Sequence, residues 1–468
     1  MHYVSTRGQA SALGFSDALL AGLATDGGLY VPEAWPQVAP ETIAGFASQP
    51  YADVAYSVVR PFVGDDIADI DLRRMCIEAY ATFRHTAVAP LVQLEPGGWV
   101  LELFHGPTLA FKDVAMQLLS RLMDHVLAER GERVTIIGAT SGDTGAAAVE
   151  AFRDRANVDL FMLLPEGRVS PFQQRQMTTS GAANIHPIVV QGTFDDCQAI
   201  VKAMFSNPRL RERLALSGVN SINWARIVAQ IVYYFTAAAA LGAPDRRVSF
   251  TVPTGNFGDI YAGYAAKRMG LPIDQLVIAT NVNDILARTL ASGRYEVGRV
   301  QPTTSPSMDI QVSSNFERVI FEACGRNGDA VRRMMASLAQ SGGFSLEPET
   351  LRAIRDDFIA GTATEDESRA TIARTFERTG FLPDPHTAVG LAIAERVEST
   401  DTPMVTLATA HPAKFAAAVE AAIGRPPPLP DGFDDFEQRE ERFAVLPNSQ
   451  EAVEAFLMDN AKAVRDEV

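Results

Sequence analysis

Short apolar runs alternate with longer segments of helical pattern between residues 133 and 205. The apolar runs predict strands, and the segments that follow them predict helices. In chain order these elements are the strands 133–139, 159–165 and 185–191 and the helices 145–153, 172–179 and 195–205. Strands that are apolar along their whole length are typical of parallel sheets covered by helices on both faces.

The same alternation returns after a long helical stretch at 224–241. In chain order it gives strand 248–253, helix 259–269, strand 275–280, a mainly helical insert at 315–379, strand 404–409 and helix 412–423. The predicted fold class is therefore α/β, with two doubly wound parallel-sheet domains. In such sheets ligands bind at the carboxyl ends of the strands.

The two ends of the chain lack this alternation. Residues 1–96 combine short helical patterns with frequent prolines, which predicts a mainly helical N-terminal region, and the acidic tail carries one predicted helix near 452–464. At 468 residues the chain is too long for a single compact core. We therefore predict a division into residues 1–96, an α/β domain at 97–220, a larger α/β domain at 221–430 and an acidic extension at 431–468.

Composition narrows the classes of function. Lys and Arg total 41 against 57 Asp and Glu, and the resulting net charge of −16 disfavours binding to nucleic acid or to anionic membranes. No apolar run reaches the ~18 residues of a membrane helix, and residues 1–10 do not resemble a secretion signal. We predict a cytoplasmic protein, although an organellar protein after removal of its leader has the same composition. The three widely spaced cysteines predict neither a disulfide framework nor a metal site.

Lys112 is the first residue whose placement indicates chemistry. It follows the turn signal Gly106-Pro107 and opens a predicted helix that extends to about Leu127. On that helix it shares a face with Met116 and Met123, and loss of hydration on an apolar face favours the uncharged amine. An uncharged amine can form an imine with a carbonyl group. The alternative is a structural lysine whose stem packs while its ammonium group reaches water.

Two loops that follow predicted strands are suited to bind anions. The hydroxyl loop, residues 139–145, has the sequence Ala-Thr-Ser-Gly-Asp-Thr-Gly, and the glycine loop, residues 253–259, has the sequence Pro-Thr-Gly-Asn-Phe-Gly-Asp. Amide and hydroxyl donors at the start of a helix bind phosphate or carboxylate groups. Neither loop matches the Walker A or the dinucleotide pattern. The alternatives are an ordinary capped helix start for the first and a tight turn for the second.

The strand 404–409 ends at Thr409, within the sequence Thr409-Ala410-His411-Pro412-Ala413-Lys414. A threonine hydroxyl at the end of a strand can donate a hydrogen bond to an uncharged ring nitrogen, whereas an aspartate there would keep that nitrogen protonated. His411, directly before a proline, is more often structural than catalytic.

Taken together, these segments resemble threonine synthase, a family of fold-type II pyridoxal-phosphate enzymes with a tryptophan synthase β-like fold. The similarity extends from Tyr3-Val4-Ser5-Thr6-Arg7-Gly8 to the segment 409–415, and it includes Leu109-Ala110-Phe111-Lys112-Asp113 and both loops. Several ordered motifs are far more specific than any one of them.

The resemblance implies a role for each motif. Lys112 would carry pyridoxal 5'-phosphate as a Schiff base and shuttle protons, and Thr409 would face the pyridine nitrogen. The cofactor phosphate would be held by Gly255, Asn256, Phe257, Gly258 and Asp259. The substrate would be bound by Thr140, Ser141, Gly142, Asp143 and Thr144, and its phosphate by Asn223 and Arg226, since arginine offers a fork to phosphate oxygens.

The implied reaction converts O-phospho-L-homoserine and water to L-threonine and phosphate, without a metal ion, in a monomer or small homo-oligomer. One alternative is another enzyme of the same fold, such as a threonine or serine dehydratase or a β-replacing synthase. The sequence Gly142-Asp143-Thr144 and the long N-terminal region argue against it. The other alternative is a non-catalytic relative that senses the cofactor or a phosphoamino acid.

Overall fold

The computed structural model describes residues 1–218, 221–397, 401–433 and 435–464. Its contacts divide the chain into two compact units. Unit 1 comprises residues 1–18, 23–111 and 221–428, and unit 2 comprises residues 19–22, 112–220 and 429–468. One of the places at which the chain passes from unit 1 to unit 2 lies between Phe111 and Lys112.

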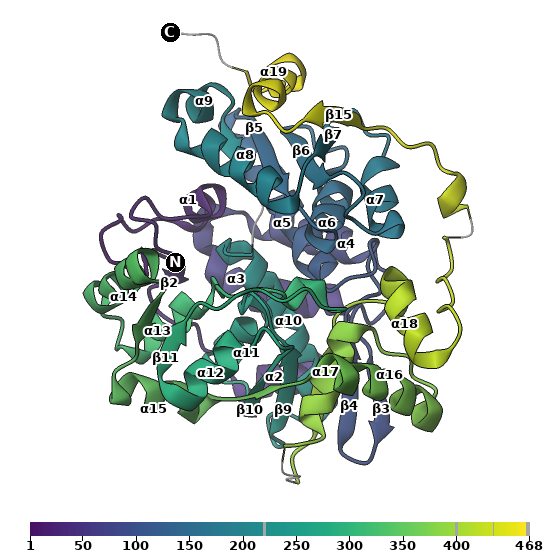
Figure 1. Ribbon diagram of the computed structural model, residues 1–468. Coiled ribbons are helices and arrows are strands. Elements are labelled where there is room, and N and C mark those ends of the chain that lie inside the picture. The colour runs from purple at the N-terminus through teal and green to yellow at the C-terminus, as the bar shows by residue number, and fades with distance from the viewer. Residues whose placement is uncertain (219–220, 398–400, 434, 465–468) are drawn as a thin grey trace. The chain divides into compact units, whose positions relative to one another are not determined.

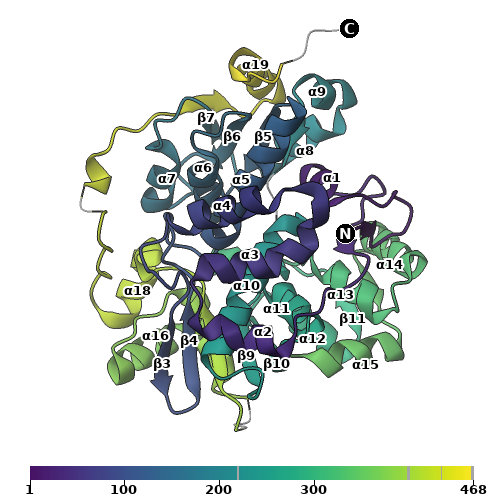
Figure 2. The same cartoon turned by 180° about the vertical axis from the view of Figure 1, so that it is seen from behind.

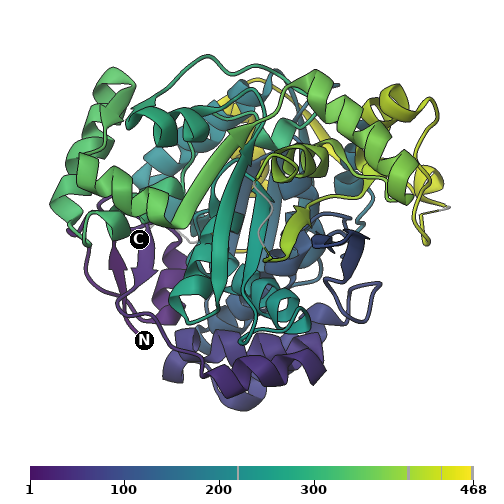
Figure 3. The same ribbon diagram turned by 90° about the horizontal axis from the view of Figure 1, so that it is seen from below.

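Unit 1 is built on a six-stranded sheet with the order β13-β10-β9-β14-β4-β3. Its strands are β3 (Leu91–Glu95), β4 (Gly98–Glu102), β9 (Val248–Pro253), β10 (Ile273–Thr280), β13 (Phe358–Thr362) and β14 (Met404–Ala408). All neighbours pair in parallel except β3 and β4, which are antiparallel. Figure 3 views the molecule from below, and the strands coloured teal to yellow-green near its centre are β9, β10, β13 and β14.

The sequence missed two parts of this sheet. β13 lies inside the insert at 315–379 that was predicted as mainly helical, and it pairs along its length with β10. The pair β3–β4 lies where no strands were predicted. β3 and β13 are the two edges of the sheet. Edge strands are only partly buried, so they lack the continuous apolar runs that identify central strands.

Helices and short strand pairs complete unit 1. The helices are α2 (Pro40–Gly45), α3 (Tyr51–Val63), α4 (Asp69–Tyr80), α10 (Trp224–Ala240), α11 (Gly258–Arg268), α12 (Ile285–Ser292), α13 (Phe316–Ala323), α14 (Gly328–Ser341), α15 (Pro348–Asp357), α16 (Glu365–Thr379), α17 (Pro385–Ala394) and α18 (Ala416–Ile423). One further helix, α1 (Phe15–Ala21), begins in unit 1 and ends in the short segment 19–22 of unit 2. The pairs are β1 (Tyr3–Ser5) with β2 (Tyr30–Pro32) and β11 (Arg294–Glu296) with β12 (Gly343–Ser345). α3 packs against the buried helix α10, as Figure 2 shows, which confirms the predicted helical N-terminal region.

Unit 2 contains a fully parallel sheet with the order β15-β7-β6-β5-β8. Its strands are β5 (Val134–Ala139), β6 (Val158–Pro165), β7 (Ile185–Gln191), β8 (Leu216–Ser217) and β15 (Ala444–Pro447), and its helices are α5 (Lys112–Arg130), α6 (Asp143–Phe152), α7 (Pro171–Thr178), α8 (Phe194–Ser206), α9 (Pro208–Arg213) and α19 (Gln450–Asn460). Figure 1 labels most of these elements. Phe161 and Ile188 of the sheet form one apolar core with Met204 of α8 and Leu457 of α19.

The chain order within each sheet identifies where a ligand can bind. In unit 2 the chain runs outward through β5, β6 and β7 and then returns to β8 on the other side of β5. In unit 1 it runs outward through β9, β10 and β13 and returns to β14 on the other side of β9. Ligands of doubly wound sheets bind at the carboxyl end of such switch points. The hydroxyl loop follows β5 and the glycine loop follows β9, so both predicted loops occupy switch points.

Candidate active site

Three neighbouring parallel strands of the unit 1 sheet end side by side, with their carboxyl ends on the same side of the sheet. β9 leads into the glycine loop, β14 leads into Thr409, and β4 leads into Leu103, whose N–H donates to the Ala408 carbonyl at 2.9 Å. Further along the chain from β4, Phe111 lies beside the end of β14, because its N–H donates to the Thr409 carbonyl at 2.8 Å. Lys112 is the following residue, and consecutive Cα atoms are ~3.8 Å apart.

The glycine loop lies so close to the segment that contains Ser307 that a side chain would not fit at its first glycine. A Cβ atom on Gly255 would lie 2.6 Å from the carbonyl oxygen of Ser307. The residue before α11, Phe257, has a left-handed φ of 64° and makes no side-chain cap to the helix. The first N–H groups of a helix have no partner within the helix. A helix start of this kind is suited to bind an anionic group.

The side chain of Asp259, the last residue of the glycine loop, is hydrogen-bonded to two tyrosines of α10. Its Oδ1 accepts hydrogen bonds from the hydroxyls of Tyr233 and Tyr234, at 2.5 and 3.1 Å. Burial raises the pKa of both tyrosines well above the usual range, and the Asp259 charge adds to that effect. A carboxylate repels a phosphate, so any contribution of Asp259 to a phosphate site comes from its backbone N–H.

Thr409 is buried and its backbone is fixed on both sides. Its N–H donates to the Thr387 hydroxyl at 3.2 Å, and its carbonyl accepts from Phe111. His411, two residues later, accepts at Nδ1 from the Ala413 N–H at 3.2 Å. Burial, with smaller contributions from His105 and Arg84, lowers the pKa of His411 to about 4. An uncharged imidazole that caps its own turn agrees with a structural role.

Asn223 and Arg226 lie at the start of α10 in the same unit. The Asn223 side chain caps the helix by accepting from the Ala225 N–H at 3.0 Å. Only 4% of Arg226 is exposed, and burial lowers its pKa to about 10. Within the described part of the chain, its Nε and Nη1 atoms have no hydrogen-bond partner. A buried donor without a partner costs ~1–3 kcal/mol, and more when it is charged.

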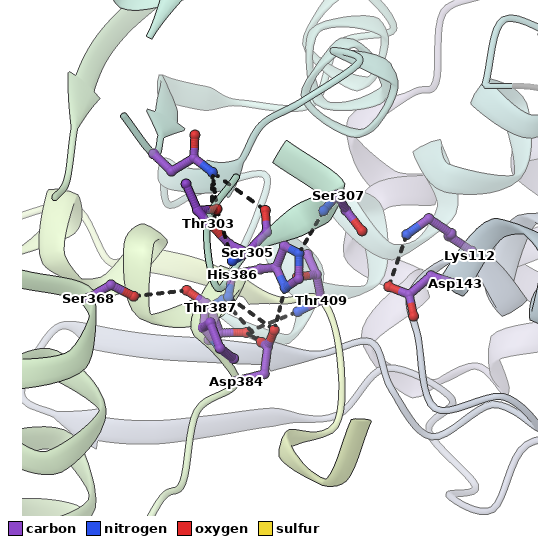
Figure 4. A network of polar contacts seen from close by, with 12 residues as sticks. Lys112, Asp143, Thr303, Ser305, Ser307, Ser368, Asp384, His386, Thr387 and Thr409 are labelled. Atoms are coloured by element: carbon purple, nitrogen blue, oxygen red, sulfur yellow. Dashed lines mark hydrogen bonds and ion pairs between the residues drawn. The ribbon is translucent and has the colours of Figure 1, made fainter. Parts of the chain in front are cut away.

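Lys112 begins α5 in unit 2 and is buried there. Its Nζ lies 3.3 Å from Oδ2 of Asp143, and the other carboxylate oxygen accepts from Nε2 of Gln173 at 2.7 Å. Figure 4 shows the lysine and the aspartate pointing toward each other. A carboxylate at this distance stabilises the charged amine. The sequence gave no sign of this neighbouring carboxylate, and the uncharged amine remains a prediction.

The hydroxyl loop is stabilised by one of its own predicted ligands. The Thr140 hydroxyl accepts from the N–H groups of Gly142 and Gly145, each at 3.0 Å, and thereby holds the start of α6. Ser141 is exposed and Thr144 is half-buried. Gly142 has a φ of 152°, and a Cβ there would lie 2.6 Å from the Gln173 amide. Thus Thr140 and Gly142 serve the loop itself, while Asp143 contacts Lys112.

Comparison with known proteins agrees with this geometry along the whole chain. Family models match in order: "Threonine synthase N terminus" at residues 2–80, "Pyridoxal-phosphate dependent enzyme" at 83–355 and "Threonine synthase, C-terminal" at 387–457. The threonine synthase of Pseudomonas aeruginosa is 55% identical, with 98% of each chain covered. The chain belongs to the threonine synthase family. Its fold is thereby confirmed as that of fold-type II pyridoxal-phosphate enzymes.

Solved structures of the family agree equally well. The pyridoxal-phosphate-bound threonine synthase of Brucella melitensis has a TM-score of 0.98 at 61% identity, covering 99% of this chain and 100% of that one. The yeast threonine synthase has a TM-score of 0.94 at 38% identity, covering 98% of each chain. As a member of this family, the chain uses pyridoxal phosphate as its cofactor.

The residues present could hold this cofactor. Its aldehyde needs a primary amine, which Lys112 could supply, and its pyridine nitrogen could meet the hydroxyl of Thr409. Its phosphate needs a close approach to backbone N–H groups, which Gly255 and the uncapped start of α11 allow. In the described residues no cluster of three or more His, Cys, Asp or Glu is arranged to bind a metal ion.

Three residues that hold the glycine loop in place were not predicted from the sequence. The Ser313 hydroxyl donates to the Gly255 carbonyl at 2.6 Å, the Ser314 hydroxyl to Asn256 Oδ1 at 3.1 Å, and the Asn315 amide to the Asn256 carbonyl at 2.8 Å. The sequence signal was a polar triplet directly before an apolar helix. That signal predicts a helix cap and does not reveal a partner nearly 60 residues earlier in the chain.

Replacing Gly255 by alanine should separate the glycine loop from the segment that contains Ser307. Because the obstructing atom is a backbone oxygen, one of the two segments has to move, at a cost of ~1–3 kcal/mol in the free energy of unfolding. We expect affinity for pyridoxal phosphate to fall ~10-fold or more, measured by fluorescence titration of the cofactor-free protein. The control is Gly45→Ala, in α2, where the nearest atom to a new Cβ is 3.7 Å away. Unchanged cofactor affinity in Gly255→Ala would contradict a phosphate site at this loop.

Proposed function

We propose that this protein is a threonine synthase that converts O-phospho-L-homoserine and water to L-threonine and phosphate. Its similarity to curated threonine synthases over nearly their whole length supports the proposal. The single structural observation that carries it is the buried guanidinium of Arg226, with two nitrogen atoms that have no partner among the described residues. A buried guanidinium of this kind is suited to bind an anionic ligand, in addition to the phosphate that we assign to the glycine loop.

The start of α10, the helix that carries Arg226, lies beside the glycine loop within unit 1. A Cβ atom on Gly258 would lie 3.5 Å from Ile227 of α10 and 3.7 Å from the Ser221 carbonyl. The Asn315 amide links the two segments by donating to both Ser221 and Asn256. We assign the cofactor phosphate to residues 255–259 and the substrate phosphate to Asn223 and Arg226. A dehydratase substrate carries no phosphate, so a dehydratase would not need the second group.

Pyridoxal phosphate, when bound, supplies an electron-withdrawing ring that stabilises negative charge at the substrate Cα. The Thr409 hydroxyl orients that ring at its nitrogen while leaving the nitrogen uncharged. Residues 140–144 bind the substrate carboxylate with the donors at the start of α6. The substrate and product differ at Cβ and Cγ, so protons must also move at these atoms. Lys112 Nζ takes the proton from Cα and carries protons to and from the neighbouring carbon atoms of the substrate.

Asp143 has two parts in this scheme. Its Oδ2 lies 3.3 Å from Lys112 Nζ, and Gln173 donates a hydrogen bond to its other carboxylate oxygen. We infer that the same contact keeps Nζ in place after the substrate amine has displaced it from the cofactor. The amine is then positioned to accept a proton, which is the geometric requirement for a general base.

The domain boundaries, cytoplasmic location and monomeric or small homo-oligomeric state inferred from the sequence remain predictions. In the described ranges, none of the helices combines the length and the hydropathy required to cross a bilayer. The small-molecule substrate is part of the proposal above.

The proposed reaction is tested by measuring two products separately. Purified protein with pyridoxal phosphate should release phosphate from O-phospho-L-homoserine and form L-threonine in equal amount. It should release little ammonia from L-threonine or L-serine. Ammonia as the main product would indicate a dehydratase, and binding of O-phospho-L-homoserine without turnover would indicate a sensor.

A further inference from the structure

A buried aspartate at the start of α17 links two parts of the cofactor site that are far apart in the sequence. Asp384 has no exposed surface and caps α17 by accepting from the N–H groups of His386 and Thr387, each at 3.0 Å. It also accepts from the side chains of the same two residues, from Nδ1 of His386 at 2.7 Å and from the Thr387 hydroxyl. Figure 4 shows this cluster and its extension to Ser307 and Thr409.

One arm of the cluster ends at Thr409. Since the single hydroxyl proton of Thr387 is donated to Asp384, its oxygen can only accept further hydrogen bonds. It accepts from the Thr409 N–H at 3.2 Å. Asp384 therefore sets the direction of the Thr387 hydroxyl, and that hydroxyl in turn holds the backbone of Thr409.

The other arm ends at the glycine loop. Nε2 of His386 accepts from the Ser307 N–H at 3.2 Å, which requires the ring proton to be on Nδ1, facing Asp384. The ring also packs edge-on against Phe415, with 4.8 Å between ring centroids. Ser307 is the residue whose carbonyl lies where a side chain of Gly255 would be. Asp384 therefore selects the histidine tautomer that keeps this segment against the loop.

We propose that Asp384 is a positioning residue for the cofactor site: it anchors the residue that faces the pyridine nitrogen and, on its other side, the glycine loop. The inference rests on the proposed assignment of Thr409 and residues 255–259 to the cofactor. An ordinary helix cap would need only the two backbone hydrogen bonds. The two side-chain hydrogen bonds exist in addition, and each leads to a different end of the cofactor site.

Two substitutions separate the two arms. Thr387→Val keeps the shape of the side chain but removes the acceptor for the Thr409 N–H. We expect kcat to fall by ~10- to 100-fold with KM changed by less than ~3-fold, together with a shift in the absorbance of the bound cofactor. Thr387→Ser restores the hydroxyl and should bring kcat back to within ~3-fold of the unmodified protein.

Asp384→Asn replaces one of the two acceptor atoms by a donor. If the new amide nitrogen faces His386, it opposes the Nδ1 proton, and the tautomer that accepts from Ser307 is no longer favoured. If it faces Thr387, it opposes the N–H and the hydroxyl proton of that residue. We expect pyridoxal phosphate to bind the cofactor-free variant ~10-fold or more weakly. In Thr387→Val the same affinity should change by less than ~3-fold.

The control is Thr289→Val, another threonine without exposed surface in a helix of unit 1, whose hydroxyl bonds only the nearby carbonyls of Ile285 and Arg294. It should lower the unfolding temperature and leave kcat and cofactor affinity unchanged. The proposal is overturned if the Thr387 variants to Val and Ser behave alike, or if Asp384→Asn retains full cofactor affinity. It is also overturned if the control loses as much kcat or affinity. Because cofactor affinity is measured without substrate, these results are independent of which reaction the protein catalyses.

Discussion

Lys112→Ala should bind pyridoxal phosphate only reversibly and should lose at least ~1000-fold in kcat for phosphate release. The alanine removes both the covalent attachment of the cofactor and the amine assigned to move protons on the substrate. The visible absorbance of the lysine-bound cofactor should disappear. Borohydride reduction of the unmodified protein should attach the cofactor to a peptide that contains Lys112, and reduction of the variant should attach none.

A second buried lysine gives a matched control. Lys414 is buried like Lys112, with 2% of its surface exposed against 7%, and its Nζ donates to the Thr108 carbonyl at 2.7 Å. Lys414→Met should lower stability but keep the covalently bound cofactor on Lys112. Lys112→Arg retains the positive charge next to Asp143 but cannot form the imine, so it should resemble the alanine variant. An active Lys112→Ala protein would refute the assignment.

Arg226→Met should make the cofactor-free protein more stable and the enzyme much less active. Removing a buried guanidinium whose Nε and Nη1 have no partner in the described residues should raise the free energy of unfolding by ~1–3 kcal/mol. Loss of its contact with a phosphate should lower kcat/KM for O-phospho-L-homoserine by ~100-fold or more. Urea unfolding and phosphate-release kinetics measure the two effects on the same preparation.

Arg318 provides the comparison, because it is an equally buried arginine that is fully bonded within the protein. Burial lowers its pKa to about 10 as well, but its guanidinium donates to the carbonyls of Tyr30 and Ile222 and to the Asn315 side chain. Arg318→Met should therefore destabilise the protein by ~3–5 kcal/mol. If Arg226→Met is destabilised to the same extent, Arg226 is structural. If it loses cofactor affinity instead of substrate affinity, Arg226 binds the cofactor phosphate.

The residues assigned to chemistry were predictable from the sequence because each lies in a local pattern. An apolar strand, a turn rich in glycine and hydroxyl groups and a helix follow one another within about 20 residues around both loops, and local patterns of this kind survive without knowledge of the fold. The predicted strands 185–191 and 248–253 coincide with β7 and β9. Lys112 opens α5 within the segment where a helix start was predicted.

The supporting residues could not be identified in the same way. Asp384 followed by Pro385 predicts a helix start, and so does the polar triplet that ends at Asn315. Nothing near either segment indicates that one would hold Thr409 and the other would hold the glycine loop. The edge strand β13 was missed for a related reason, since its place beside β10 depends on a partner 82 residues away.

The sequence by itself therefore determined most of the elements and the cofactor family, and it predicted which residues carry reactive groups, because these depend on neighbours along the chain. Only the tertiary structure decided which strands are adjacent. It thereby decided that residues 255–259 and Thr409 follow the carboxyl ends of two neighbouring strands, β9 and β14, of one sheet. It also decided which buried charges are paired, as for Lys112 with Asp143, and which carry donors without partners, as for Arg226. The physical reason is that burial and hydrogen-bond pairing of polar side chains are set by contacts between distant segments.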